Sequence, residues 1–149
     1  MIRLASRADV PALAALRRSW VEENAGSAVP DEDFEDAFAS WFDDEVGRRV
    51  MWLAEVDGVP VGMLNMMVFD RMPRPGLAPS SWGYLANLYV VPQHRGAGTG
   101  AELVASCTAY ADEHGFVRVV LSPSERSVPL YQRAGFGPAE ELMVRRARH

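Results

Sequence analysis

The sequence predicts one α/β domain of the α+β type, spanning residues 1–149, with a mixed, mainly antiparallel central sheet and helices on both faces. Two β-rich runs flank Asp57-Gly58, a dipeptide typical of tight hairpins. The apolar run Tyr84–Val91 leads into a glycine-rich turn, Gln93–Gly100, and a helical pattern follows, so a strand–helix–strand crossover belongs there. Amphipathic helices elsewhere cover the sheet.

The N-terminal segment has the marks of a short strand and a capped helix. Ile2–Leu4 alternates between apolar and polar residues. Ser6 is a good N-cap residue, with Asp9 three positions later as a capping box, and the helix should stop near Gly26.

A second helix is expected from Pro30–Asp33 onward, with acids in its first turn that match the helix dipole. Its apolar stripe consists of Phe34, Ala37, Phe38, Trp41 and Phe42, and its opposite face carries Glu35, Asp36, Asp43 and Asp44. Two interpretations stay open. The stripe faces the core and the acids face water, or some aromatics line a ligand pocket and some acids attract a cation.

The remaining elements follow from apolar runs and from the glycine and proline residues that interrupt them. A loop rich in proline joins the hairpin to the central strand, and Cys107 lies on the apolar face of the helix after the glycine turn, so it belongs to the core. The expected elements are strands Arg49–Val56 and Val59–Phe69, loop Asp70–Ser81, strand Trp82–Val91, helix Gly98–His114, strand Phe116–Leu121, a short helix within Ser122–Ala134 and a last strand Glu140–Arg146.

Composition excludes several function classes. Half of the acids fall within Glu22–Glu45, which contains no Arg or His, and the net charge is −5, so no basic stripe for nucleic acid is expected. No apolar run is long enough to span a membrane. A single cysteine excludes an internal disulfide, fits a cytoplasmic setting, and with three scattered histidines offers no metal site.

The Gln93–Gly100 turn is suited to binding an anion. Glycines permit positive φ and close backbone approach, and N–H groups at a helix start face the ligand. A Walker loop is excluded because Ala101-Glu102 follows the last glycine and the chain has no lysine. A Rossmann turn is disfavoured because Ala101 takes the place of its third glycine and no acid ends the next strand, at Leu121.

Two segments in order resemble the GCN5-related N-acetyltransferase superfamily (GNAT). Asn87–Gly100 is similar to the family's strand followed by Gln/Arg-x-x-Gly-x-Gly/Ala, and Pro129–Phe136 to its Leu-Tyr-x-x-x-Gly-Phe. The resemblance spans essentially the whole chain and implies a GNAT-like acyl-CoA acyltransferase fold.

The resemblance implies acetyl-CoA as acyl donor, with no metal. The loop would wrap the pyrophosphate, the strand before it would bond the pantetheine arm through main chain, and a family position for Asn is held by Ser124. Arg95 would either contact a phosphate or pair with a surface acid. The implied donor-binding residues are Leu88, Tyr89, Val90, Gln93, Arg95, Gly96, Ala97, Gly98, Thr99, Gly100 and Ser124.

For catalysis, the resemblance assigns Tyr131 as the general acid that protonates the leaving thiolate. Many relatives keep a glutamate on the central strand. Here that strand has no acid, and Asn87 can at most orient a water or the substrate, because an amide is not a useful base. Glu22, Glu23 or a water chain remain as candidate bases.

The resulting expectation is an N-acetyltransferase acting on a primary amine, in a ternary complex. The acidic stretch and its aromatics suggest a cationic acceptor with some apolar body, bound by Trp20, Glu23, Phe38, Trp41 and Tyr84. Two alternatives stay open: a non-catalytic acyl-CoA binding or sensing module, and an acetyltransferase acting on a protein N-terminus or lysine. The resemblance leaves a homodimer open.

Overall fold

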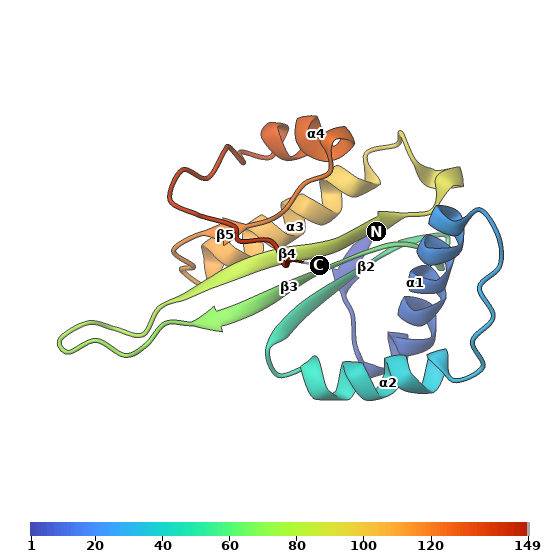
Figure 1. Cartoon of the computed structure of the whole chain (residues 1–149), viewed down its shortest axis with the longest axis horizontal. Coiled ribbons are helices and arrows are strands. Elements are labelled where there is room, and N and C mark those ends of the chain that lie inside the picture. Colours follow the sequence, from blue (N-terminus) through green and yellow to red (C-terminus); the bar gives the residue numbers. More distant parts are fainter. Residues whose placement is uncertain (149) are drawn as a thin grey trace.

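The computed structural model describes residues 1–148 and contains a five-stranded sheet flanked by helices (Figure 1). The strands lie in the order β1-β2-β3-β4-β5, and every neighbouring pair is antiparallel except the parallel pair β4 and β5. The expected mixed, mainly antiparallel sheet is therefore confirmed. The elements are β1 Ile2–Leu4, α1 Val10–Ala25, α2 Phe34–Glu45, β2 Arg49–Val56, β3 Val59–Asp70, β4 Ser81–Val90, α3 Thr99–Glu113, β5 Val119–Val120 and α4 Val128–Arg133.

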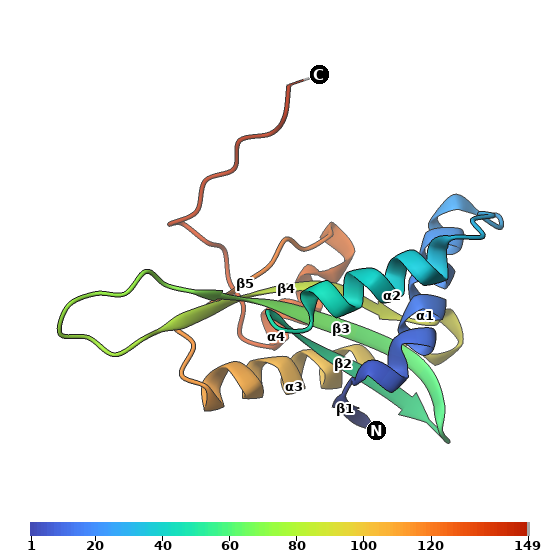
Figure 2. The same ribbon diagram turned by 90° about the horizontal axis from the view of Figure 1, so that it is seen from below.

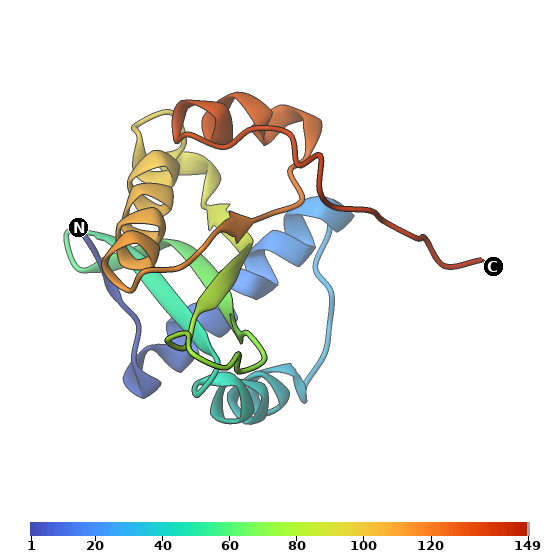
Figure 3. The same ribbon diagram turned by 90° about the vertical axis from the view of Figure 1, so that its left-hand side faces the viewer.

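Two apolar cores lie on opposite faces of the sheet, because side chains alternate along each strand. Figure 3 shows α1 and α2 on one side of the sheet and α3 on the other. In β2, Leu53 packs with α1 and α2, whereas its neighbour Trp52 packs with α3. Cys107 of α3 is fully buried in the second core, next to the sulfur of Met66 at 3.6 Å. Burial raises the pKa of the Cys107 thiol to about 12, so this cysteine is a core residue, as expected.

Local signals place the turns and helix ends. Asp57 and Gly58 both have positive φ, 51° and 76°, as a tight two-residue hairpin requires. The backbone N–H of Ser6 donates to Asp9 at 2.8 Å, and Gly26 ends α1 in the left-handed conformation. The hairpin and the two ends of the first helical segment are therefore confirmed.

The β3–β4 connection is an irregular, exposed loop over residues 71–80 that protrudes from the body (Figure 1). At its base the rings of Phe69 and Trp82 stack with centroids 4.4 Å apart. This agrees with the expected loop.

The C-terminal part differs from expectation. The strand expected over Phe116–Leu121 is only Val119–Val120, and the strand expected over Glu140–Arg146 is absent. Residues 137–148 are irregular, and the end of this segment extends away from the body of the molecule (Figure 2). Met143 is 98% exposed. A short apolar run can form a strand only where it finds a partner, and this segment finds none among the described residues.

No helix in the described range 1–148 is long and apolar enough to cross a membrane.

Candidate active site

Strand β4 carries a bulge at its centre. Met63 of β3 pairs with Tyr89 and Asn65 pairs with Ala86, so Leu64 alone faces both Asn87 and Leu88. Asn87 has a φ of 60°, a left-handed conformation that asparagine tolerates better than most residues. The bulge turns the Asn87 side chain toward the α1 and α2 face, where it lines a cavity.

Beyond Tyr84, β4 has an open edge. Its pairing with β5 is limited to Gly83 and Tyr84. On the other edge the N–H of Val91 donates to Val61 of β3 at 2.8 Å. Because main-chain groups alternate between the two edges of a strand, the N–H groups of Val90 and Leu88 face the open edge. Tyr89 instead pairs with Met63 of β3, and this pairing does not favour its expected main-chain contact with the donor.

The Gln93–Gly100 turn follows this open edge. Gly96 and Gly98 have positive φ values of 81° and 88°, as expected for glycines that shape such a turn. Within the described chain, the N–H groups of Gly96, Ala97 and Gly98 donate to no backbone acceptor. Those of Thr99 and Gly100 lie in the first turn of α3, where no intrahelical acceptor exists. The turn therefore presents a row of unused donors, which suits a phosphate group.

Arg95 points away from this row of donors. Its guanidinium nitrogen Nη2 donates to both oxygens of Glu23, at 2.8 and 2.9 Å, and its Nε donates to the Val90 carbonyl at 2.8 Å. Of the two alternatives for Arg95, the structure shows pairing with a surface acid. The hydroxyl of Tyr89 donates to Glu23 as well, at 3.0 Å.

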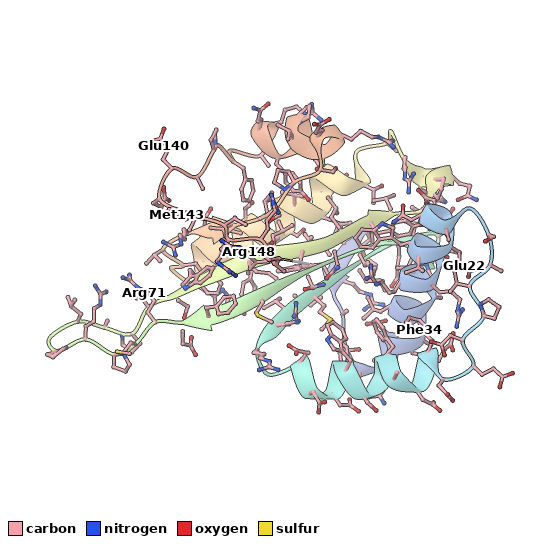
Figure 4. The ribbon with its side chains drawn as sticks, in the orientation of Figure 1. Glu22, Phe34, Arg71, Glu140, Met143 and Arg148 are labelled. Atoms are coloured by element: carbon pink, nitrogen blue, oxygen red, sulfur yellow. The ribbon has the colours of Figure 1, made fainter. Side chains whose placement is uncertain are left out.

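These contacts decide the role of Glu23. Hydrogen bonding to Arg95 holds the pKa of the Glu23 carboxyl below its usual range, which weakens it as a base. Glu22 accepts the N–H of Val29 at 3.2 Å and orders the chain after α1, where Figure 4 labels it. Neither glutamate lines the cavity at Asn87.

A cavity of about 440 Å³ lies between α1, α2 and the sheet, and we call it the α1–α2 cavity. Phe34 enters it from the start of α2 (Figure 4). Its apolar surface comes largely from aromatic and aliphatic side chains, and its polar surface from two arginines and two asparagines. The lining residues are Leu13, Arg17, Phe34, Ala37, Phe38, Trp41, Arg49, Met51, Met63, Leu64, Asn65 and Asn87.

The stripe of α2 therefore divides between core and cavity. Phe42 is buried in the core, whereas Phe38 and Trp41 line the cavity, as expected for these two. The acids of α2 do not line it. Glu45 is buried and bound to arginines, and Glu35 pairs with Arg18 outside the cavity.

A chain of hydrogen bonds crosses the floor of the cavity. Arg49 Nη1 donates to Asn65 Oδ1 at 2.8 Å, and Asn65 Nδ2 donates to Asn87 Oδ1 at 2.9 Å. Glu45 accepts from Arg49 Nε at 3.0 Å and from Arg48 at 2.9 Å. Since a guanidinium can only donate, it fixes the orientation of both amides and leaves Asn87 Nδ2 as a donor toward the cavity.

Two other expected acceptor residues lie elsewhere. The ring of Trp20 stacks on Tyr89 with centroids 5.6 Å apart and does not line the cavity. The hydroxyl of Tyr84 is hydrogen-bonded to Ser122 at 2.9 Å near the β4–β5 pairing. Among the donor-binding residues, Gln93 is exposed and Ser124 caps a short turn, with its hydroxyl donating to Ser127 at 3.0 Å.

Tyr131 lies in α4, on the other side of the sheet from the α1–α2 cavity. It is 8% exposed and lines a second hollow of about 620 Å³ between α3, β5, α4 and the C-terminal segment. Burial raises the pKa of its hydroxyl. Among the described residues the Tyr131 hydroxyl has no hydrogen-bond partner. Every fully buried side-chain oxygen in this part of the chain does have a partner, so the Tyr131 hydroxyl is not fully buried and contacts solvent. Tyr131 and Asn87 do not share a cavity.

Sequence reasoning missed Arg17, Arg49 and Asn65. Asn65 carried a signal, because it is a polar residue in the middle of an apolar strand, and a buried amide needs partners. The arginines carried none, since their place at the cavity depends on how α1 and β2 pack. The described residues contain no group of three or more His, Cys, Asp or Glu side chains that could hold a metal ion.

The chain is similar to known acetyltransferases. The chain is 32% identical over 83 residues to a glucosamine 6-phosphate N-acetyltransferase of Trypanosoma brucei brucei, a match covering 56% of this chain and 54% of that relative. It thus spans about half the length of that protein.

Solved structures show the same fold. A predicted acetyltransferase from Clostridium acetobutylicum with acetyl-CoA superposes with a TM-score of 0.76 at 21% identity, covering 98% of this chain and 95% of the other. A GCN5-related N-acetyltransferase from Ralstonia eutropha JMP134 has a TM-score of 0.72 at 28% identity, with 97% of both chains covered. The acetyltransferase (GNAT) family model matches residues 13–136, and this chain belongs to that family.

Proposed function

We propose that this protein transfers the acetyl group of acetyl-CoA to the primary amine of a small molecule, with both substrates bound at once. One observation carries the proposal. The bulge in β4 places the α1–α2 cavity, at Asn87, next to an open strand edge that ends in the glycine turn. An acceptor in the cavity and a donor along the edge would meet at this strand.

The residues of the chain fit the donor. The unused N–H groups from Gly96 to Gly100 would bind the pyrophosphate, and charge-assisted hydrogen bonds of this kind contribute roughly 1.5–3 kcal/mol each. The open-edge groups of Leu88 and Val90 would hold the pantetheine arm. The N–H of Val90 would then stabilise the oxyanion that develops on the thioester, a role typically worth about 2.7–4 kcal/mol.

The chemistry is a direct aminolysis. The neutral amine attacks the thioester carbon, a carbon–nitrogen bond forms, and the carbon–sulfur bond breaks. The amine releases its proton to water, because none of the described residues that line the cavity is acidic. Asn87 Nδ2 donates a hydrogen bond that orients this water or the acceptor. The thiolate takes a proton from Tyr131, whose raised pKa keeps its hydroxyl protonated at neutral pH, and the tyrosinate regains a proton from water to complete the cycle.

A second candidate function is a non-catalytic acyl-CoA binding or sensing module. The observation that favours it is the lack of a carboxylate or imidazole among the described residues lining the α1–α2 cavity, so no side-chain base stands ready. An acceptor that is a protein N-terminus or lysine is the third candidate, and peptides with either group belong in the same assay.

The test combines binding with turnover. Isothermal titration calorimetry measures acetyl-CoA binding, and release of free thiol is followed with a panel of amines and two peptides, with the acetylated product identified by mass spectrometry. Glucosamine 6-phosphate is included because a relative carries that name. Thiol release that depends on an amine, with acetylated amine as product, supports the proposal. Tight acetyl-CoA binding without turnover of any amine or peptide would favour the sensing module.

A further inference from the structure

The charged groups of the α1–α2 cavity have one sign. Arg17 enters from α1 and Arg49 from β2, and no acidic residue lines the cavity in the described chain. Arg17 takes part in none of the ion pairs among the described residues, and its guanidinium lies 4.9 Å from the ring centroid of Trp20. A cation placed beside an apolar surface attracts anions more strongly than one in open water.

The partner of Arg49 does not cancel this charge. Arg49 is largely buried, with 15% of its side chain exposed, and Glu45 binds it at 3.0 Å. The same carboxylate also binds Arg48 at 2.9 Å. Two guanidinium groups thus share one carboxylate, and the cluster keeps a net positive charge. The guanidinium of Arg49 also lies 5.3 Å from the ring centroid of Trp41, on the wall of the cavity.

The uncharged polar groups of the cavity also favour an anionic ligand. The hydrogen-bond chain from Arg49 uses the carbonyl oxygens of both Asn65 and Asn87 as acceptors. What remains for a ligand is the Asn87 amide nitrogen and its hydrogens, together with the guanidinium of Arg17. The floor of the cavity therefore offers donors and matches a ligand rich in acceptor oxygens.

None of the acids of the stretch 22–45 lines the cavity. Four of them have partners outside it: Glu22 binds the Val29 N–H, Glu23 binds Arg95, Glu35 binds Arg18, and Asp43 binds Arg7 at 2.8 Å. The cavity lining therefore does not favour the cationic acceptor that these acids suggested.

We infer that the acceptor is an anionic amine: a molecule whose primary amine reaches β4 at Asn87 while a carboxylate or phosphate group lies against Arg17 and Arg49. The apolar rings of Phe38 and Trp41 select an acceptor with some apolar body between these groups. This inference rests on the proposed function, because it names the substrate class of the same cavity.

Matched amines that differ only in the anion test the inference. Phenylalanine and phenethylamine differ by a carboxylate, and O-phosphoethanolamine and ethanolamine differ by a phosphate. In thiol-release assays at low ionic strength, at least one member that carries the anion should show a kcat/KM 10-fold or more above that of its partner without the anion. The pair with the larger ratio identifies the anion. Equal or higher kcat/KM for both partners without the anion would overturn the inference while leaving acetyl transfer intact.

Variants locate the anion site. Arg17→Gln should lower kcat/KM for the substrate with the anion by about 10- to 100-fold and change kcat/KM for the partner without the anion by less than threefold, since a hydrogen bond to a charged group is lost. Arg49→Gln should cause a similar loss for the substrate with the anion and a smaller loss for its partner, because Arg49 also orients Asn65 and Asn87. Arg49→Lys should recover part of the loss. Arg71→Gln is the control, because this arginine is exposed in the β3–β4 loop and does not line the cavity.

Two readouts separate the inference from the proposed function. Isothermal titration calorimetry of the same amines, without acetyl-CoA, tests the anion site even if no turnover occurs. Binding of an anionic amine that Arg17→Gln weakens supports the inference, whatever the catalytic outcome. Thermal unfolding checks that each variant folds. If Arg49→Gln does not fold, the binding and activity of Arg17→Gln alone decide whether the inference holds. If folded Arg17→Gln loses activity equally toward amines with the anion and amines without it, the inference is overturned.

Discussion

One guanidinium nitrogen of Arg95 donates hydrogen bonds to both carboxylate oxygens of Glu23, at 2.8 and 2.9 Å, across 72 positions of the chain. The contact joins the last turns of α1 to the start of the glycine turn, and the Arg95 side chain also holds the Val90 carbonyl. Arg95 therefore links α1 to the start of the glycine turn, and we expect its guanidinium to add little to phosphate binding.

If the role of Arg95 is to link α1 to the glycine turn through Glu23, removing Arg95 or Glu23 should have the same effect on stability and on acetyl-CoA binding. Arg95→Gln and Glu23→Gln should lower the midpoint of thermal unfolding by similar small amounts, since partly exposed pairs contribute little. Each should raise the Kd for acetyl-CoA less than threefold. Calorimetry with both variants checks this. A rise above tenfold in Arg95→Gln alone would instead identify a direct phosphate contact.

The glycine turn can be tested through its backbone. Gly98 has a φ of 88°, and a Cβ there meets nothing within 4 Å, so Gly98→Ala introduces backbone strain without a clash. The strain, roughly 1–2 kcal/mol, favours a different turn and should raise the Kd for acetyl-CoA about tenfold. Gly76→Ala is the matched control, with a φ of 76° and open space in the protruding loop. It should cost similar stability and leave the Kd unchanged.

Tyr131 is expected to act on the chemical step. Tyr131→Phe should lower kcat by about 100-fold, the lower end for general acids, with the Kd for acetyl-CoA changed less than threefold. Tyr84→Phe, which loses only a hydroxyl bonded to Ser122, should leave kcat unchanged. Since burial raises the pKa of Tyr131, wild-type kcat should not fall between pH 7 and about pH 9 through loss of this proton. Unchanged turnover in Tyr131→Phe would remove the assigned role.

Acid should weaken the fold through Asp9. The Nη1 and Nη2 atoms of Arg3 and the N–H of Ser6 donate hydrogen bonds to the Asp9 carboxylate, each at 2.8 Å. These bonds lower the pKa of Asp9 from 3.8 to about 2. A lowered pKa contributes stability above the ordinary value and loses it as pH falls through the folded value. Thermal midpoints of wild type and Asp9→Asn should thus differ most near pH 6 and converge toward pH 2.

The control for this pH series is Glu32→Gln, an exposed residue before α2. Its midpoints should follow those of the wild type at every pH. A gap between wild type and Asp9→Asn that is constant from pH 6 to pH 2 would show that the carboxylate contributes nothing through its charge.

The local sequence was sufficient to predict much of the fold and the backbone conformation of the glycine turn. The Asp57-Gly58 hairpin, the Gly26 helix end and the positive φ of Gly96 and Gly98 depend on a few adjacent residues. So does the row of free N–H groups, because a glycine turn entering a helix always leaves its first donors unpaired. These features could be predicted because backbone conformation responds to neighbours in the chain.

The charges at the α1–α2 cavity required the tertiary structure. The acids of residues 22–45 suggested a cationic acceptor, yet none of them lines the cavity, while Arg17 and Arg49 enter it. The last expected strand failed for a related reason, since the apolar run within Glu140–Arg146 has no strand partner in the described structure.

The sequence by itself determined the family motifs, the order of the elements and the backbone shape of the glycine turn, all of which arise from short-range spacing. Only the tertiary structure decided which charges face the α1–α2 cavity. The path from Arg49 through Asn65 to Asn87 crosses β2, β3 and β4, and it exists because strand register and the bulge bring these side chains within hydrogen-bonding distance. No spacing along the chain encodes that register.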